Sequence, residues 1–328
     1  MKQRVFITRP IPAPEELKKL FAKFDVVANS KPGALSRDEL KKKVKGVHAI
    51  FSLLTDRIDE EVMEAAGSQL KIIANYAVGF DNIDLLAAKK RGIVVTNTPG
   101  PETSEAVAEH AMTLICALAR HIVEADRFTR AEEYHGWLPN LFLGVLLRGK
   151  TLGIVGLGRI GLILGQIAAA GFGMKVLYSD PRHDREFEKQ LKARRVNLHA
   201  LLKQSDFVSL HVPLLPSTRH LMSTKEFALM KPAAHLINTA RGPVVDEKAL
   251  LKALTRKQIA GAALDVFECE PTIDCDIRDN LELKKIPNVI LTPHIASATI
   301  EVRRAMARVA VANIVAVLSG KKPLTPAS

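Results

Sequence analysis

Three polar side chains of the sequence follow segments that read as buried strands. Arg241 comes after the apolar run AHLINT, Glu270 after GAALDV, and His294 after VILTP. The carboxyl ends of parallel strands meet at one edge of a sheet, where open α/β folds bind their ligands. We therefore expect the arginine, the glutamate and the histidine to share one crevice.

These residue types suit the interconversion of a keto acid and a hydroxy acid. A histidine can give or take the proton of the reacting oxygen near neutral pH, and a neighbouring carboxylate favours its protonated form. An arginine can hold a substrate carboxylate and polarise the carbonyl. Each residue also has a structural alternative, which is a surface salt bridge for Arg241 or Glu270 and a satisfied core histidine for His294.

A glycine-rich stretch could hold the redox cofactor that such chemistry requires. In GLGRIG, Gly156, Gly158 and Gly161 follow a short apolar run and open an apolar helix. The first glycine allows a tight turn, the second lets the backbone approach a pyrophosphate, and the third lets the helix pack closely on the strand. Backbone N–H groups at Arg159 and Ile160 would then face the phosphates.

The next strand-like run, KVLYS, is followed by Asp180, about 20 residues after the last glycine, where a carboxylate accepts hydrogen bonds from the adenosine ribose. The same charge repels the additional phosphate of NADP. We therefore expect NAD, with NADP less favoured, although Arg182 lies nearby. The alternative is an ordinary turn acid before Pro181.

Strand-like and helix-like segments alternate along the chain, which is typical of α/β proteins. Helices are expected at 14–24, 36–44, 59–68, 102–120 and about 297–318, the last packing back on the first domain. The expected caps are Ser36 with Glu39 for the second helix and Thr103 or Ser104 for the fourth. The expected strands are RVFITR, DVVAN, HAIFSLL, KIIANYA and IVVTNT, then TLGIVG, KVLYS, FVSLHV, AHLINT, GAALDV and VILTP.

The bulk composition narrows the class of protein. A chain of 328 residues, 47% hydrophobic and 25% charged, suits two globular domains. The three cysteines (Cys116, Cys269 and Cys275) have no paired spacing, which favours a cytoplasmic protein without a structural zinc. No leader and no apolar run of about 18 residues is evident, so we expect no membrane partner.

The formal net charge of +12 raises the question of nucleic-acid binding. The basic residues are scattered, however, and only three tyrosines and one tryptophan accompany them. Solvated helix faces are the better interpretation, and a charge of this sign can also raise the local concentration of small anions.

Six segments together resemble the D-isomer-specific 2-hydroxyacid dehydrogenases, in particular the glyoxylate/hydroxypyruvate reductase branch. They are NYAVGFDNIDL, GKTLGIVGLGRIG, SDFVSLHVPLLPSTRHL, LMKPAAHLINTARGPVVDEKAL, GAALDVFECEP and TPHIASAT. The resemblance implies two doubly wound parallel-sheet domains. A Rossmann NAD-binding domain at 101–295 is inserted into a flavodoxin-like catalytic domain formed by 1–100 and 296–328.

The resemblance also assigns residue roles. It implies that Arg241, Glu270 and His294 are the catalytic trio acting on a small anionic 2-keto or 2-hydroxy acid. The backbone at Val78 and Gly79 would receive the substrate carboxylate. A homodimer is implied, with a contribution from the segment near Trp137. Further cofactor contacts would come from Val212, Pro213, Thr239, Ala240, Arg241, Asp265, His294 and Ala296.

Some positions separate this branch from its relatives. Phosphoglycerate dehydrogenases tend to carry an arginine where this chain has Asn75, and formate dehydrogenases carry a glutamine at the Glu270 position. NADP-using reductases tend to have Ser-Arg at Asp180-Pro181. The stretch TIDCDIRDNLELKKIPN before the histidine is longer than expected. The alternatives left open are 3-phosphoglycerate oxidation and an NAD(H)-sensing corepressor on the same fold.

Overall fold

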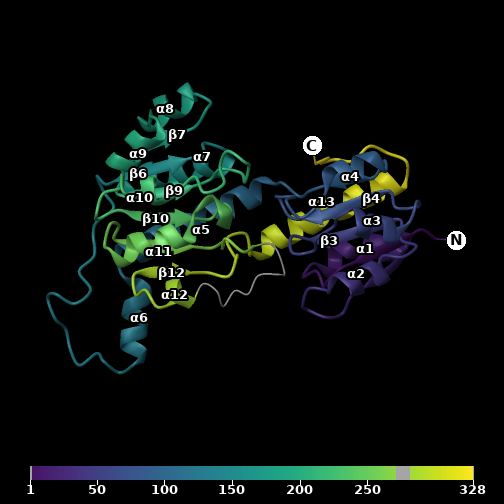
Figure 1. The fold of residues 1–328 in the computed structure, drawn as a ribbon, viewed down its shortest axis with the longest axis horizontal. Coiled ribbons are helices and arrows are strands. Elements are labelled where there is room, and N and C mark those ends of the chain that lie inside the picture. Colours follow the sequence, from purple (N-terminus) through teal and green to yellow (C-terminus); the bar gives the residue numbers. More distant parts are fainter. Residues whose placement is uncertain (1, 271–280, 328) are drawn as a thin grey trace. The chain divides into compact units, whose positions relative to one another are not determined.

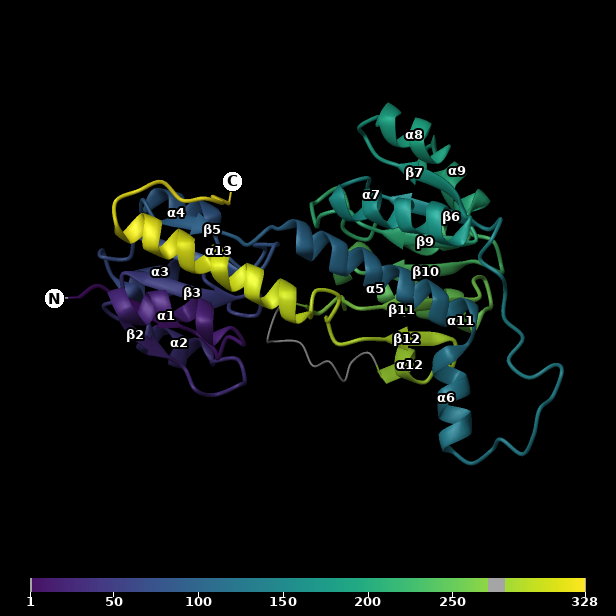
Figure 2. The ribbon, with the colours of Figure 1, turned by 180° about the vertical axis from the view of Figure 1, so that it is seen from behind.

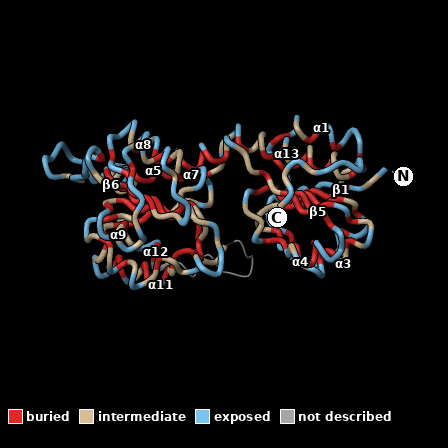
Figure 3. The backbone as a smooth tube through the Cα atoms, turned by 90° about the horizontal axis from the view of Figure 1, so that it is seen from above, coloured by how far each residue is buried: buried red, intermediate tan, exposed pale blue. Residues whose placement is uncertain are grey.

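The computed structural model describes residues 2–270 and 281–327, so part of the long stretch before His294 lies outside the described residues. The described chain divides into two compact units. One unit comprises residues up to 103 together with those from 298, and the other runs from 104 to 270 and continues to 297. In each unit the strands form the buried centre (Figure 3).

The first unit contains a five-stranded parallel sheet with the order β2-β1-β3-β4-β5. This is the flavodoxin-like doubly wound order. Figure 1 shows its strands β3 and β4 among the helices of this unit. All five predicted strands are confirmed, because short apolar runs that are buried on both faces leave little ambiguity. Their bounds are β1 (Arg4–Ile7), β2 (Asp25–Ala28), β3 (Ala49–Leu53), β4 (Ile72–Tyr76) and β5 (Val94–Thr96).

Helices cover both faces of this sheet. Residues of α2 (Arg37–Lys43), α3 (Glu60–Ala66) and α4 (Leu85–Lys90) form one apolar cluster with the strands. On the opposite face α13 (Ile300–Leu318) packs on β4 beside α1 (Pro14–Lys23) (Figure 2). The predicted return of the last helix and the capping box of α2 are both confirmed.

The second unit contains a seven-stranded parallel sheet with the order β12-β11-β10-β9-β6-β7-β8. The six predicted strands are confirmed, and their order is that of a dinucleotide-binding sheet with the reversal between β6 and β9. The additional strand, β8, has two exposed residues and therefore no apolar signal. The bounds are β6 (Thr151–Val155), β7 (Lys175–Ser179), β8 (Arg194–Arg195), β9 (Phe207–Leu210), β10 (His235–Asn238), β11 (Gly261–Leu264) and β12 (Val289–Leu291).

Two apolar clusters flank this sheet. Side chains of α5, α7 and α8 form the cluster on one face, and those of α9, α10 and α11 form the cluster on the other. The helices are α5 (Pro101–Ala119), α6 (Ile122–Arg130), α7 (Arg159–Gln166), α8 (Arg185–Leu191), α9 (Leu198–Gln204), α10 (Thr224–Phe227), α11 (Glu247–Thr255) and α12 (Leu281–Lys284).

The predicted start of α5 was wrong. The helix begins at Pro101, so Thr103 and Ser104 lie inside its first turn rather than at the cap. Proline is favoured at a first helical position because its missing N–H is not needed there. Among the described residues, no single helix is long and apolar enough to cross a bilayer, although the bent α5–α6 pair meets both criteria when taken together.

Candidate active site

The glycine loop after β6 has the geometry that the motif predicts. Gly156 has φ of 93°, and a Cβ there would lie 2.9 Å from the carbonyl of His211. A Cβ on Gly161 would lie 2.5 Å from the Gly156 oxygen. Both positions therefore exclude any side chain. At Gly158, in contrast, a Cβ would meet no atom within 4 Å, so open space lies in front of this backbone.

Helix α7 begins directly at this open space. Its N-cap is Gly158 and offers no capping side chain, so the N–H groups of Arg159 and Ile160 have no side-chain cap. At the end of β10, the buried Thr239 hydroxyl has no hydrogen-bond partner among the residues that the structure describes. An uncapped helix start, an open glycine and an unsatisfied hydroxyl at one sheet edge fit a pyrophosphate-containing dinucleotide.

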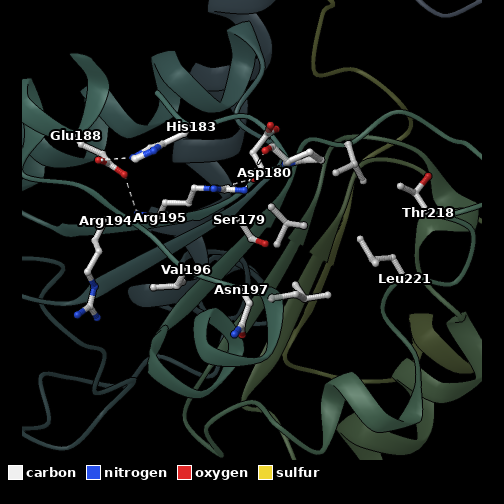
Figure 4. A pocket seen from close by; sticks show the side chains of 14 residues that line it. Ser179, Asp180, His183, Glu188, Arg194, Arg195, Val196, Asn197, Thr218 and Leu221 are labelled. Carbon is white, nitrogen blue, oxygen red and sulfur yellow. Dashed lines mark hydrogen bonds and ion pairs between the residues drawn. The ribbon is translucent and has the colours of Figure 1, made fainter. Parts of the chain in front are cut away.

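A cavity of about 860 Å³ lies at the carboxyl ends of β6, β7 and β9 (Figure 4). Asp180 lines it, and its two carboxylate oxygens accept hydrogen bonds from the N–H groups of Leu157 (2.8 Å) and Arg182 (2.7 Å). A carboxylate keeps further lone pairs for ribose hydroxyls. The complete lining is Val155, Ser179, Asp180, Pro181, His183, Glu188, Arg194, Arg195, Val196, Asn197, Leu198, Val212, Thr218 and Leu221.

The sequence interpretation missed the basic groups of this cavity. Arg195 donates from Nε to the Asp180 carbonyl and from Nη2 to the Pro181 carbonyl, both at 2.9 Å. His183 pairs with Glu188 at 2.9 Å, and this hydrogen bond holds the pKa of the glutamate below its ordinary value. In the sequence, only the adjacent residues Arg194 and Arg195 could have indicated that basic groups line this cavity. Of the residues assigned to the cofactor, Asp180 and Val212 line the cavity, whereas Pro213 does not.

The predicted histidine and glutamate are in contact. His294 Nδ1 lies 2.6 Å from Glu270 Oε2, and the two side chains are 30% and 24% exposed. His294 follows β12 and adopts a left-handed backbone with φ of 55°. The fold thus brings together two side chains that lie 24 residues apart in the sequence. Their catalytic role stays a prediction.

Asp265 tethers the turn that carries this histidine. Its fully buried carboxylate accepts hydrogen bonds from the N–H groups of Ile295 (2.9 Å) and Ala296 (2.8 Å) and from the Thr292 hydroxyl (2.6 Å). Burial opposes ionisation, but these hydrogen bonds, together with the nearby His110 side chain, hold the pKa of the Asp265 carboxyl below its ordinary value.

His110 on α5 is a second residue that the sequence interpretation missed. Its Nε2 lies 3.6 Å from Asp265 Oδ1 and 3.3 Å from the Thr292 hydroxyl oxygen. The Ala296 N–H, on a residue assigned to the cofactor, is already bound to Asp265. Nothing local in the helix sequence distinguishes a histidine that faces a carboxylate from one that faces solvent.

Arg241 lies in a loop that its neighbours hold rigidly. The Asn238 side chain accepts from the Ala240 N–H (3.0 Å) and donates to the Arg241 carbonyl (2.9 Å), while Arg241 Nη1 donates to the Ala240 carbonyl (2.8 Å). A Cβ on Gly242 would lie 1.7 Å from the Phe267 oxygen. The loop after β10 therefore touches the segment that leads to the glutamate.

Val78 and Gly79 belong to the other unit, in the loop that follows β4. This loop lies at the carboxyl edge of its sheet, and the Val78 side chain is 42% exposed. The two residues are thus at the edge where a doubly wound sheet binds ligands. Their role in substrate binding stays a prediction.

Comparison with known proteins identifies the family to which this chain belongs. The model of the D-isomer specific 2-hydroxyacid dehydrogenase NAD binding domain matches residues 112–296. Glyoxylate reductase from Thermococcus litoralis is 51% identical over 98% of this chain and 96% of its own length. The chain belongs to the D-isomer-specific 2-hydroxyacid dehydrogenase family.

Three other proteins show a similar likeness to this chain. Glyoxylate reductase from Pyrococcus furiosus is 47% identical over 99% of this chain and 95% of its own length. The solved TT0316 protein from Thermus thermophilus matches with a TM-score of 0.89 and 41% identity, covering 99% of this chain and 100% of that one. A solved glyoxylate reductase from Paecilomyes thermophila matches with a TM-score of 0.84 and 32% identity, covering 99% of this chain and 98% of that one.

The protein is therefore a nicotinamide-dependent 2-hydroxyacid dehydrogenase, an oxidoreductase that interconverts 2-keto and 2-hydroxy acids. The predicted family, fold class and nicotinamide cofactor are confirmed. The choice between NAD and NADP and the identity of the keto acid belong to the proposal that follows.

Proposed function

We propose that this dehydrogenase reduces glyoxylate or hydroxypyruvate to the corresponding D-2-hydroxy acid with NADH. The observation that carries the proposal is the contact of 2.6 Å between His294 and Glu270 at the carboxyl edge of a dinucleotide-binding sheet. The names of the relatives at about half identity support the choice of glyoxylate.

A nicotinamide cofactor, held by the glycine loop after β6 and by Asp180, would supply the hydride. His294 gives a proton from Nε2 to the substrate oxygen as negative charge develops there, because its Nδ1 is held by Glu270. The glutamate orients the imidazole through this contact of 2.6 Å. In the reverse direction the neutral imidazole takes the proton. Arg241 binds the substrate carboxylate and polarises the carbonyl, and the backbone at Val78 and Gly79 binds the same carboxylate.

The cofactor proposal is NAD in preference to NADP, and it rests on the Asp180 carboxylate in the cavity wall. A fixed negative charge repels a ribose 2′-phosphate. We expect Asp180→Ser to raise the ratio of kcat/KM with NADPH to that with NADH by about tenfold or more, because one removed charge at close range is worth at least about 1.4 kcal/mol. An unchanged ratio would remove this acid from the account of cofactor choice.

One assay tests the reaction. The purified protein is given NADH or NADPH with glyoxylate, hydroxypyruvate, pyruvate or phosphohydroxypyruvate, and oxidation is followed by the absorbance of the reduced nicotinamide. Turnover that is fastest with glyoxylate or hydroxypyruvate supports the proposal. A preference for the phosphorylated acid would favour the 3-phosphoglycerate reaction. Binding of NADH without turnover of any acid would favour the corepressor-like alternative.

We also propose a cytoplasmic homodimer. The segment between α6 and β6 exposes Trp137 to 79%, Leu143 to 71% and Leu146 to 78%. Apolar side chains at this density suit contact with a second copy. Sedimentation of the wild type should give a dimer mass, and Leu146→Asp should shift it toward monomer. A monomeric wild type would contradict the proposal, and cell fractionation tests the compartment.

A further inference from the structure

Three successive carbonyl groups after β4 are bound from the protein side. The Ala77 oxygen accepts from the Thr98 N–H at 2.9 Å. The Val78 oxygen accepts from Asn97 Nδ2 at 2.7 Å, and the Gly79 oxygen accepts from Asn75 Nδ2 at 2.9 Å. Two side-chain amides and one backbone N–H therefore set the orientation of three consecutive peptide groups.

The N–H groups of the same peptides have no acceptor within residues 2–270 and 281–327. In a trans peptide the carbonyl and the following N–H point in opposite directions. The N–H groups of Val78, Gly79 and Phe80 are accordingly directed away from the groups that hold the carbonyls. None of the three donates a hydrogen bond to another described residue. Successive N–H groups without acceptors are a binding site for an anion.

Asn75 is held at the end of a buried polar network. It is fully buried in β4, where its Oδ1 accepts from the Ser52 hydroxyl of the paired strand at 3.0 Å. Its Nδ2 donates to Gly79 and to Asn82 Oδ1 (3.1 Å). Because both N–H groups of this amide are used inside the protein, the side chain offers no donor to a substrate phosphate.

Asn97 is held by the segment that follows α13. Its carbonyl accepts from the Thr325 hydroxyl at 2.6 Å. Thr325 in turn accepts from Asn313 Nδ2 (2.8 Å), and Asn313 is fully buried in α13. Residue 326 also forms a bridge with residue 96 at the edge of the sheet. A chain of hydrogen bonds thus connects the last helix with the peptide between Val78 and Gly79.

We propose that Asn97 and Asn75 are positioning residues for the substrate. They orient the peptides after Ala77 so that the N–H groups of Val78, Gly79 and Phe80 receive the carboxylate of a small, unphosphorylated 2-keto acid. Thr325 acts in the same way through Asn97. This inference rests on the proposed function, because the anion is the substrate of that reaction.

The test compares Asn97→Ala and Thr325→Val with Gln69→Ala as the matched control. Gln69 is in the same unit, and its amide also donates to two backbone carbonyls, those of Val47 and Ala66, away from this loop. For each protein we measure KM and kcat with glyoxylate, the inhibition constant of oxalate, the Kd of NADH and the thermal unfolding midpoint. Oxalate is the probe because it carries the carboxylate without a reducible carbonyl.

We expect Asn97→Ala to raise KM and the oxalate inhibition constant together by about tenfold, the scale of a hydrogen bond to a charged group. Thr325→Val should raise both by about threefold, because it loosens Asn97 without removing it. The Kd of NADH and kcat should stay within about twofold, as for a loss of uniform binding. The Gln69→Ala control should leave KM, kcat, the oxalate inhibition constant and the Kd of NADH unchanged within the same factor.

A folded Asn97→Ala protein with wild-type KM and oxalate inhibition would overturn the inference, as would an equal loss of NADH affinity. If Asn97→Ala does not fold, Thr325→Val decides by the same two constants. If the wild type reduces no keto acid, the proposed function fails, and oxalate binding by calorimetry alone decides the positioning role.

Discussion

Replacing Asp265 by asparagine tests whether this buried carboxylate holds the turn that carries His294, the proposed proton donor. One oxygen faces the Ile295 N–H and the Thr292 hydroxyl, and the other faces the Ala296 N–H. An amide group has one oxygen and one NH2. In either orientation the NH2 faces a backbone N–H, so one donor at the turn loses its acceptor.

The cost follows from the burial of this carboxylate, which is not exposed at all. A hydrogen bond to a charged acceptor contributes about 1.5 to 3 kcal/mol, and a buried donor left without a partner costs about 1 to 3 kcal/mol. Together these amount to about 2.5 to 6 kcal/mol. For a unit of this size the unfolding midpoint should fall by about 10 °C. If His294 moves by about 1 Å, kcat should fall by about 100-fold.

Thermal unfolding and steady-state kinetics measure these effects, with Asp246→Asn as the control. Asp246 caps α11 by accepting from the Ala249 N–H at 3.0 Å, a role that asparagine fills equally well. The control should therefore change stability by less than about 0.5 kcal/mol. Since the pKa of Asp265 is lowered on folding, its contribution is present above its unfolded pKa and is lost as the pH falls below about 4.

The reasoning is refuted if Asp265→Asn unfolds at the wild-type temperature and retains wild-type kcat at neutral pH. A loss of stability with normal kcat would contradict only the link to the histidine. The gap in stability between the variant and the wild type should narrow below about pH 4. A constant gap across this range would show that the carboxylate is not ionised in the folded protein.

Three further outcomes follow from single contacts. Glu270→Gln should lower kcat by about 100-fold with NADH binding unchanged, because His294 keeps a hydrogen-bond partner but the negative charge at position 270 is removed. A normal kcat would exclude the carboxylate from the proton transfer. Gly242→Ala should prevent correct folding, since its Cβ would lie 1.7 Å from the Phe267 oxygen, and a wild-type circular dichroism melt would contradict this. Burial lowers the pKa of His235 to about 4, so the stability of the wild type falls as the pH drops from about 6.5 toward 4. His235→Phe should flatten the plot of unfolding midpoint against pH in this range. An unchanged slope would assign the loss of stability to other groups.

The glycine loop after β6 and the position of Asp180 after β7 could be predicted from the sequence, while their contacts with a cofactor stay predictions. A glycine whose Cβ has no room, a helix that starts at an open glycine and an acid at the next strand end are local features, readable within about 30 residues. The eleven predicted strands are confirmed for the same reason, because apolar runs buried on both faces are short and distinct. Strand β8 escaped prediction because its two residues are exposed and carry no apolar pattern.

By itself the sequence determined the alternation of elements, the glycine loop, Asp180 and the types of residue that end each strand. Only the tertiary structure decided which of these side chains meet. His294 contacts Glu270, and Asn97 binds a segment 228 residues away. Such partners are chosen by the order of strands and the packing of helices on them, so no local pattern contains them. The hydrogen bonds that hold the histidine turn and the loop after β4 are for this reason properties of the fold.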